Sequence, residues 1–570
     1  MPSPLFATAP LRLLRPLAVA AALLAACPGY AANAAPPALA DTGAEQAALQ
    51  SLLAGQDDVL KIDGELLDAD ALRQLYRPHH WQPLWGDQAD SLMEILGAAD
   101  QEGLQPSRFH LRAIAHRRVD GADAKTRAEA ELLLTDGVLR YASAMRGQRV
   151  DPRTIEDDWF LVPAPFDARP FVTAHEKDIV PALQSLQPPY AGYQLLRRQL
   201  AYLRAVAAAG GWPKVPMGPT LKPGAVDPRI PAVRRRLMAT GELSADQPVT
   251  PVYDADLQAA VRLFQQRHGL TDDAELGRRS VAALDVSPRE LAQQVVVNME
   301  RWRWLPPHLE SNHIVVNVPA AWLEVVENGK AVLSMKTVVG DPKHPTPALH
   351  AQLRSLVINP TWHVPSSIAT KEILPKLKKD PTYLLANDLE IVSSSFPPGS
   401  PESQGIGIDW SSRTTFPWSL RQSPGSDNAL GHIKFNIPNQ EDIYLHDTPN
   451  HHAFSRASRD LSHGCVRLEN PDALALYLLR DKDWTQARLN QEVQQGDTHT
   501  VMISKAVPVW LFYWTMWVDT DGVLQIRDDI YDRDRRLEAA LARPPSAKVE
   551  IVPKTSTQPQ KVICEGCRIP

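Results

Sequence analysis

The chain has 570 residues, and because a single hydrophobic core rarely serves more than about 300 residues, several domains are expected. Apolar residues make up 44% and charged residues 22%, a composition that excludes a disordered or membrane-embedded chain. Lys and Arg total 60 against 66 Asp and Glu, so the net charge of -6 carries no basic footprint and nucleic acid is not an expected partner.

The first 34 residues have the pattern of a secretory signal peptide. Arg12 and Arg15 precede an apolar run from Leu17 to Ala26, and Ala32-Asn33-Ala34 offers a cleavage site. The run is shorter than the roughly 20 apolar residues that cross a bilayer, so we expect cleavage rather than a membrane anchor. The alternative is lipidation at Cys27, because the residues before it resemble a lipoprotein cleavage box.

Residues 46–210 carry helical periodicity interrupted by Pro and Gly turns, which predicts an all-α scaffold domain. A proline-rich linker is expected over residues 211–228. The histidines of the helical part lack metal-ligand spacing to one another, and no role is assigned to His79, His80, His110 and His116.

Residues 229–290 predict a compact helical unit. Leu257, Val261 and Phe264 fall at i, i+4 and i+7 and form an apolar helix stripe. The segment resembles the peptidoglycan-binding three-helix module, and the positions that match the pattern of that module are Asp273, Gly277, Ser280, Ala283 and Leu284. The resemblance implies binding of wall glycan and peptide, whereas a spacer role is the alternative.

Short β-branched runs separated by Gly, Pro and Asn turns predict a β-rich domain over residues 312–504, and Asn328-Gly329 is a hairpin turn signal. Residues 362–431 lie between two of these strands and combine a helix broken by Pro375 with loop-like sequence. Long insertions of this kind are usually functional lids or disordered, so we expect a mobile cap.

The C-terminal part predicts a β extension over residues 505–540, with a hairpin turn at Asp521-Gly522, and a flexible tail over residues 541–570. The tail contains Cys564 and Cys567. A disulfide, half of a metal site and a redox pair all fit these two residues, and we favour an inessential disulfide.

Cys465 lies in the run Ser462-His463-Gly464-Cys465, which follows His446 after fifteen intervening residues. An oxidising compartment tends to pair structural cysteines, so this solitary thiol indicates chemistry, although a buried inert cysteine is the alternative. A nucleophilic thiol needs a base that holds it as thiolate and donors for an oxyanion. His446 is the expected base and His463 its rival, while Gly464 permits a turn that frees nearby amides.

This arrangement resembles the signature of the L,D-transpeptidase catalytic domain, in which a His is followed after a similar gap by Ser/Thr-His-Gly-Cys and a polar residue two positions further on. Many members carry Asn at that last position, where Arg467 stands here, as in the large Gram-negative branch. The flanking run "RQSPGSDNALGHIKFNIPN" and the domain order also resemble that branch. The resemblance implies a multidomain α+β fold. It also implies that the protein is located in the periplasm.

The resemblance implies that Cys465 is the nucleophile, that His446 accepts and donates the proton, and that His463 and Gly464 shape the oxyanion site. The residues assigned to the substrate side are Arg467, Ser462, Asp447, Arg421 and Asn428.

Two of these residues have alternative roles. Asp447 could orient His446 through its carboxylate, but we prefer its backbone carbonyl, because a neighbour's side chain points across the strand. Arg467 could anchor the substrate or form an ion pair with Glu469, and both readings stay open.

The reaction implied is a two-step acyl transfer, without metal or organic cofactor. Cys465 would attack a tetrapeptide stem of peptidoglycan, release D-Ala and pass the acyl group to the amine of a second stem, giving a 3→3 cross-link. Expected partners are the stem peptides, the glycan and carbapenem β-lactam inhibitors, and protein partners are not predicted. The alternatives are a cysteine carboxypeptidase or endopeptidase and an inactive wall-binding scaffold.

Overall fold

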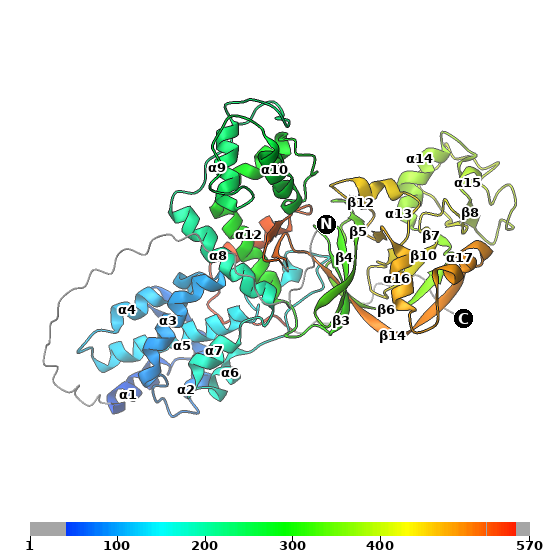
Figure 1. Ribbon diagram of the computed structural model, residues 1–570. Helices are drawn as coiled ribbons and strands as arrows, with labels where there is room; N and C mark the ends of the chain where they lie inside the picture. The colour runs from blue at the N-terminus through cyan, green and yellow to red at the C-terminus, as the bar shows by residue number, and fades with distance from the viewer. Residues whose placement is uncertain (1–41, 520, 554–570) are drawn as a thin grey trace.

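The computed structural model describes residues 42–519 and 521–553, so the predicted signal peptide, Cys27, Cys564 and Cys567 lie outside the described residues. The chain forms a helical domain, a small helical module and a β-rich domain that carries an inserted lobe (Figure 1). The prediction of a multidomain α+β fold is confirmed.

The N-terminal domain is built around the long helix α5 (Ala124–Met145), whose N-terminus is capped by the Asp123 side chain. Helix α5 is buried on most of its surface because shorter helices surround it, namely α1 (Thr42–Leu52), α2 (Ala69–Tyr76), α3 (Ala89–Gly97), α4 (Leu111–Arg117) and α6 (Ala168–Ala174), while α7 (Ile179–Ser185) packs on α3. The domain is not purely helical, since β1 (Val59–Ile62) and β2 (Glu65–Asp68) form an antiparallel hairpin.

Two long helices, α8 (Ala191–Ala208) and α12 (Pro288–Arg303), pack on each other and connect the helical domain to the rest of the chain. Helix α12 begins with a capping box, in which Ser287 and Glu290 satisfy each other's backbone amides. Trp302 of α12 stacks on Trp514 with ring centroids 4.4 Å apart. The connecting helices therefore share one core with the C-terminal part of the chain.

The small module contains α9 (Ile230–Thr240), α10 (Ala255–Arg267) and α11 (Arg278–Asp285), and the apolar stripe predicted on α10 is fully buried in its core. The predicted linker is partly wrong. Val215 and Leu221 are buried in the same core, and Leu221 pairs with Leu276 in an isolated β-bridge. Apolar residues between the prolines therefore hold much of this segment against the module.

The β-rich domain is a nine-stranded sheet in the order β12-β5-β13-β11-β10-β6-β14-β3-β4, and an additional pairing of β4 with β5 closes the sheet on itself. Its strands are β3 (Asn312–Asn317), β4 (Trp322–Glu327), β5 (Lys330–Gly340), β6 (Leu349–Ile358), β10 (Ile433–Asn436), β11 (Leu445–His446), β12 (Asp460–Ser462), β13 (Val466–Leu468) and β14 (His499–Phe512). Helices α16 (Pro471–Leu478) and α17 (Gln486–Gln495) contribute to its core. Asn328 and Gly329 both have positive φ between β4 and β5, as the predicted hairpin turn requires.

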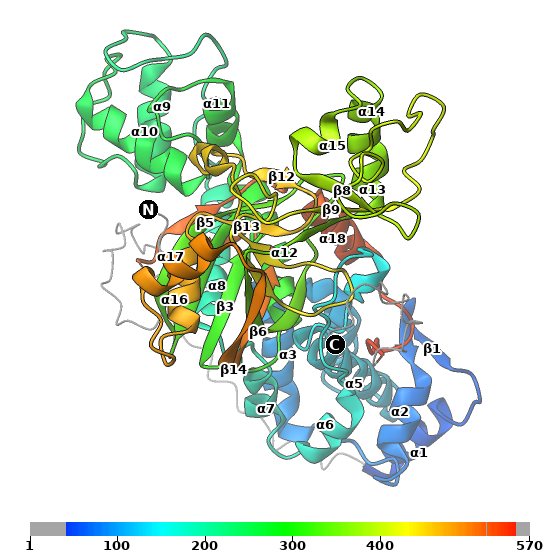
Figure 2. The same cartoon turned by 90° about the vertical axis from the view of Figure 1, so that its right-hand side faces the viewer.

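The inserted segment folds as a separate lobe, the cap, with a core of its own. A three-stranded sheet in the order β7-β9-β8 lies beside a helical run, and the elements are β7 (Trp362–Val364), α13 (Ser366–Ile368), a π-helical turn (Ala369–Ile373), α14 (Leu374–Leu377), α15 (Tyr383–Ala386), β8 (Leu389–Val392) and β9 (Ser419–Gln422). Pro375 does not break the helix, because it lies in the first turn of α14, directly after the π-helical turn. Figure 2 shows the cap and the α9–α11 module as separate lobes on either side of the sheet.

The C-terminal part corrects two expectations. The predicted hairpin is present as β15 (Met516–Val518) and β16 (Leu524–Ile526), but β14 crosses the predicted domain boundary at residue 504, and α18 (Arg533–Ala542) is helical rather than β. Residues 541–553 are not a free tail, since they pack on the helical domain and bury Val552.

In the part of the chain that the structure describes, no helix combines the length and apolar character needed to cross a membrane.

Candidate active site

Three neighbouring strands bring the predicted residues together. Strand β11 pairs with β13 in parallel, with His446 opposite Arg467, and with β10 in antiparallel fashion, with His446 opposite Lys434. Cys465 immediately precedes β13, next to the position that faces Leu445. Because residues opposite one another in adjacent strands lie about 5 Å apart, Cys465, His446 and Arg467 share one short stretch of the sheet.

His446 is buried, and its Nδ1 lies 2.5 Å from the carbonyl oxygen of Asp447. A carbonyl only accepts, so Nδ1 carries the proton and Nε2 is left as the basic nitrogen. The Asp447 carboxylate does not reach the ring, because it accepts from the amides of His432 at 2.8 Å and Thr448 at 2.7 Å. The geometry matches the backbone role preferred for Asp447, and the carboxylate assigned to the substrate side holds backbone amides instead.

The resting charges of the site are set by burial. Burial, followed by the nearby Arg467 and Lys434 cations, lowers the pKa of His446 to about 3. Burial also raises the pKa of Cys465, although hydrogen bonds from Tyr444 and the same two cations work in the opposite direction. Both shifts favour the neutral forms, so the structure favours a resting thiol beside a neutral imidazole over the resting thiolate expected from the sequence.

Tyr444 is a site residue that the sequence reasoning missed. It is hydrogen bonded to the Cys465 thiol, and its ring meets that of His446 edge to face, with centroids 5.5 Å apart. The ammonium group of Lys434 lies 4.2 Å from the centroid of the Tyr444 ring. The available signal was the alternation of the strand, which directs Tyr444 and His446 to the same face.

The loop before Cys465 is held by its own side chains. The Ser462 hydroxyl donates to the carbonyl of Cys465 at 2.6 Å and accepts from the amide of Gly464 at 3.2 Å. Gly464 has φ +106°, a region that favours glycine, and its carbonyl accepts from Thr346. We expected the amides of this turn to be free, but the Gly464 amide is bonded to Ser462. The amide of Cys465 has no partner among the described residues.

His463 faces the cap and is engaged there. Its Nε2 lies 2.5 Å from the carboxylate of Glu372 in the π-helical turn, and its ring lies over that of His344, with centroids 4.4 Å apart. These contacts hold His463 toward the cap rather than toward the thiol, which favours His446 as the base.

Arg467 is half-buried beside Cys465, and its Nε has no hydrogen-bond partner among the described residues. The proposed ion pair with Glu469 is absent from these residues, because Glu469 contacts the backbone amide and the ammonium group of Lys336 instead. The guanidinium group is therefore available for an anionic ligand.

The two remaining substrate-side residues are engaged within the protein. Arg421 forms an ion pair with Glu390 at 2.8 Å inside the sheet of the cap. Asn428 is buried, and it donates to the carbonyls of Pro360 and Ser423 while its Oδ1 accepts from the Leu430 amide. These hydrogen bonds support a structural role for Asn428 in the turn before β10.

No group of three or more His, Cys, Asp or Glu side chains is placed to hold a metal ion within residues 42–519 and 521–553. The chemistry that these residues themselves offer is nucleophilic attack by the Cys465 thiol, with His446 as the proton acceptor.

Comparison with known proteins identifies three parts of the chain. Residues 311–494 match the family model of the L,D-transpeptidase catalytic domain, residues 70–200 that of a scaffold domain, and residues 226–284 that of a "Putative peptidoglycan binding domain". A "Putative L,D-transpeptidase" from Haemophilus influenzae is 33% identical over 312 residues, which are 53% of this chain and 62% of the relative. The chain thus covers less than two thirds of that relative's length.

Solved structures give weaker likenesses. An L,D-transpeptidase from Mycobacterium smegmatis has 16% identity and a TM-score of 0.19, covering 35% of this chain and 58% of the other. L,D-transpeptidase 3 from Mycobacterium tuberculosis, in complex with a faropenem-derived adduct, has 16% identity and a TM-score of 0.18, covering 35% and 60%. Because these TM-scores are low, the assignment rests on the sequence matches. Residues 311–494 therefore belong to the L,D-transpeptidase catalytic-domain family, and a scaffold domain and a peptidoglycan-binding domain precede them in the chain.

Proposed function

We propose that the protein is a peptidoglycan L,D-transpeptidase that forms 3→3 cross-links between stem peptides through a thioester on Cys465. One observation carries the proposal. A thiol, a histidine whose Nδ1 is held by a backbone carbonyl and a guanidinium group without a carboxylate partner among the described residues lie together at two adjacent strands, β11 and β13, of a domain from this family.

The first step is acylation. The sulfur of Cys465 attacks the carbonyl carbon at the L-centre of the diamino acid while Nε2 of His446 takes the thiol proton. The Cys465 amide donates to the resulting oxyanion, and Tyr444 stabilises charge on the sulfur. The tetrahedral intermediate then collapses, the bond to the D-Ala nitrogen breaks, and His446 returns its proton to that nitrogen.

The second step transfers the acyl group. The side-chain amine of a second stem attacks the thioester carbonyl, and His446 accepts a proton from the amine. The carbon–sulfur bond then breaks, an amide bond forms, and the proton returns to the thiol. The cap would close over the site and exclude water, which favours the amine as the acceptor. Glu372 of the cap already contacts His463, two residues before Cys465.

Other residues and domains fit the same proposal. Arg467 would bind a carboxylate of the stem, since its guanidinium group has no acidic partner among the described residues. The α9–α11 module would hold the enzyme on the wall, in the periplasm. Solved structures of L,D-transpeptidases contain the carbapenem imipenem or a faropenem-derived adduct, and we also propose that carbapenems acylate Cys465.

Mass spectrometry of purified tetrapeptide muropeptides after incubation with the protein tests the proposal. We expect cross-linked dimers and free D-Ala with the wild type and neither product with Cys465→Ala. His446→Gln should lower the rate by about 10²-fold or more, whereas His499→Gln, at an exposed histidine paired with Glu492, is the matched control. Release of D-Ala without any dimers would contradict transfer and favour the carboxypeptidase alternative.

A further inference from the structure

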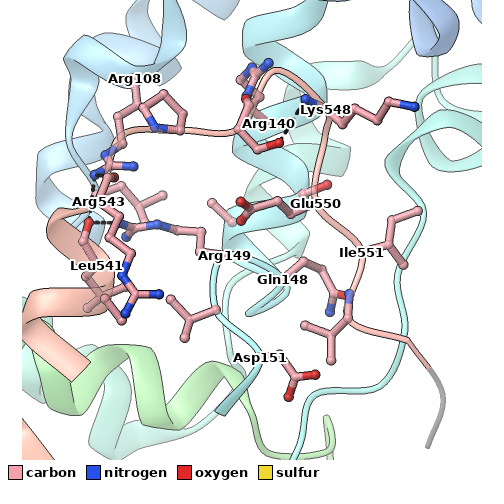
Figure 3. Close-up of a pocket in the computed structure, with 18 of the residues that line it drawn as sticks. Arg108, Arg140, Gln148, Arg149, Asp151, Leu541, Arg543, Lys548, Glu550 and Ile551 are labelled. Carbon is pink, nitrogen blue, oxygen red and sulfur yellow. Dashed lines mark hydrogen bonds between the residues drawn. The ribbon is translucent and has the colours of Figure 1, made fainter. Parts of the chain in front are cut away.

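A pocket of about 420 Å³ lies between the helical domain and residues 543–553 (Figure 3). Helix α5 and the 3-10 turn Pro106–Phe109 form one side, and the end of α18 with the C-terminal segment forms the other. Neither Cys465 nor any residue assigned to the catalytic mechanism lines it. The size is that of a small-ligand site.

Cations outnumber carboxylates in the lining of this pocket. Arg140 is neutralised by Asp136, Lys548 by Asp58, and the lining residue Asp151 is paired with Arg153. The charged lining residues outside these three ion pairs determine the net charge of the pocket, and they are Arg108, Arg149, Arg543 and Glu550.

Three guanidinium groups of this set face one carboxylate. Arg108 donates to the backbone carbonyls of Leu541 at 2.7 Å and Arg543 at 2.6 Å and to the side-chain oxygen of Gln105 at 2.8 Å, and it has no carboxylate partner among the described residues. Arg149 donates to Leu541 and lies 3.9 Å from Glu300, while Arg543 has no ion pair among the described residues. The pocket therefore holds more positive charge than its own acids balance.

An unsatisfied polar group also faces this pocket. The hydroxyl of Ser143, on α5, is buried and has no hydrogen-bond partner among the described residues, and the residue as a whole is only 4% exposed. A buried hydroxyl without a partner costs about 1–3 kcal/mol in general, so such groups usually meet a ligand or a water molecule. Apolar side chains of Leu104, Phe109 and Val552 line the pocket as well.

The C-terminal segment already places one carboxylate in the pocket. Figure 3 shows Glu550 between Arg140 and Arg149, although no nitrogen of either arginine comes within ion-pair distance of it. The neighbouring backbone is fixed, because the amide of Val549 donates to Asp68 and that of Val552 donates to Gln148. A short peptide with an acidic residue between apolar ones is thus compatible with the shape and charge of the pocket.

We propose that this pocket is a binding site for a peptide that bears carboxylates, distinct from the catalytic centre. The carboxylate of the ligand would pair with Arg149 and Arg543, next to Glu550, and Ser143 would complete its hydrogen bonds. Stem peptides of the wall carry such carboxylates. Their choice as ligand rests on the proposed function, whereas the existence of the site does not.

Isothermal titration of the full chain tests this proposal, in a Cys465→Ala background so that no turnover occurs. The probe is the free stem tetrapeptide, L-Ala-γ-D-Glu-diaminopimelate-D-Ala, and inorganic phosphate is titrated in parallel. We expect saturable binding of the tetrapeptide that Arg543→Gln weakens about tenfold, as for the loss of one charged hydrogen bond. Ser143→Ala should weaken it less, without lowering the melting temperature, and Glu550→Gln should strengthen it.

Arg146→Gln is the matched control, because Arg146 follows the same helix but stacks on Phe166 and does not line this pocket. Equal affinities in all variants, or an equal loss in the control, would overturn the proposal. Saturable binding of phosphate without the tetrapeptide would also overturn it. Failure of the proposed function is seen separately, as the absence of muropeptide dimers with the unmodified Cys465 enzyme.

Discussion

The protonation state of Cys465 and His446 offers the sharpest test of the site. With a pKa of about 3, only about one His446 ring in 10⁴ is protonated at pH 7. Burial raises the pKa of Cys465 above its ordinary value of 9.0, so less than about 1% of the thiol is ionised at that pH. A resting ion pair of thiolate and imidazolium is thus disfavoured from both sides.

Alkylation of Cys465 by iodoacetamide, followed by mass spectrometry between about pH 5 and about pH 10, measures this state. Only the thiolate reacts readily, so the logarithm of the rate should climb with pH at a slope of about one and show no plateau near neutrality. Lys434→Gln removes a cation that lowers the pKa of both groups. The variant should therefore alkylate more slowly at each pH in this range, while the pKa of His446 rises.

Lys336→Gln is the control, since this lysine contacts Glu469 rather than the thiol. A rate plateau already reached below neutral pH, insensitive to Lys434→Gln, would show a resting thiolate. That result would refute the view that burial dominates the electrostatics of the pair, and His446 would then act as a standing counter-ion.

Three further predictions concern the support of the site. Gly431→Ala should abolish cross-linking in the muropeptide assay and lower stability by more than about 1–2 kcal/mol in urea unfolding, because φ is +60° and the added methyl would overlap the Asp447 carboxylate. Glu372→Gln should loosen the cap from His463, so hydrogen exchange over residues 362–431 should be faster in the free enzyme. Carbapenem acylation should protect the same residues, and equal exchange in the free and the acylated enzyme would contradict a mobile lid. Truncation after Leu541 should lower the melting temperature without abolishing cross-linking, and an unchanged melting temperature would show that the packed segment contributes nothing.

Local signals in the sequence predicted the elements whose formation needs only neighbouring residues. The apolar stripe of α10 and the two-residue turn at Asn328-Gly329 are present because spacing and backbone preference act over a few residues. Packing between distant segments has no such signal. The buried residues of the predicted linker and the attachment of residues 541–553 to the helical domain therefore went unpredicted.

The same division applies to the site. The sequence by itself determined the nucleophile and base candidates, because the spacing of His446 and Ser462-His463-Gly464-Cys465 is a specific motif and alternation along a strand fixes which side chains share a face.

Only the tertiary structure decided what those residues meet. The pairing of β10, β11 and β13 places Lys434 and Arg467 beside the thiol, burial leaves thiol and imidazole neutral, and the cap directs His463 away. Desolvation and strand pairing depend on residues from separate strands and from the inserted cap, so no pattern among neighbouring residues records them.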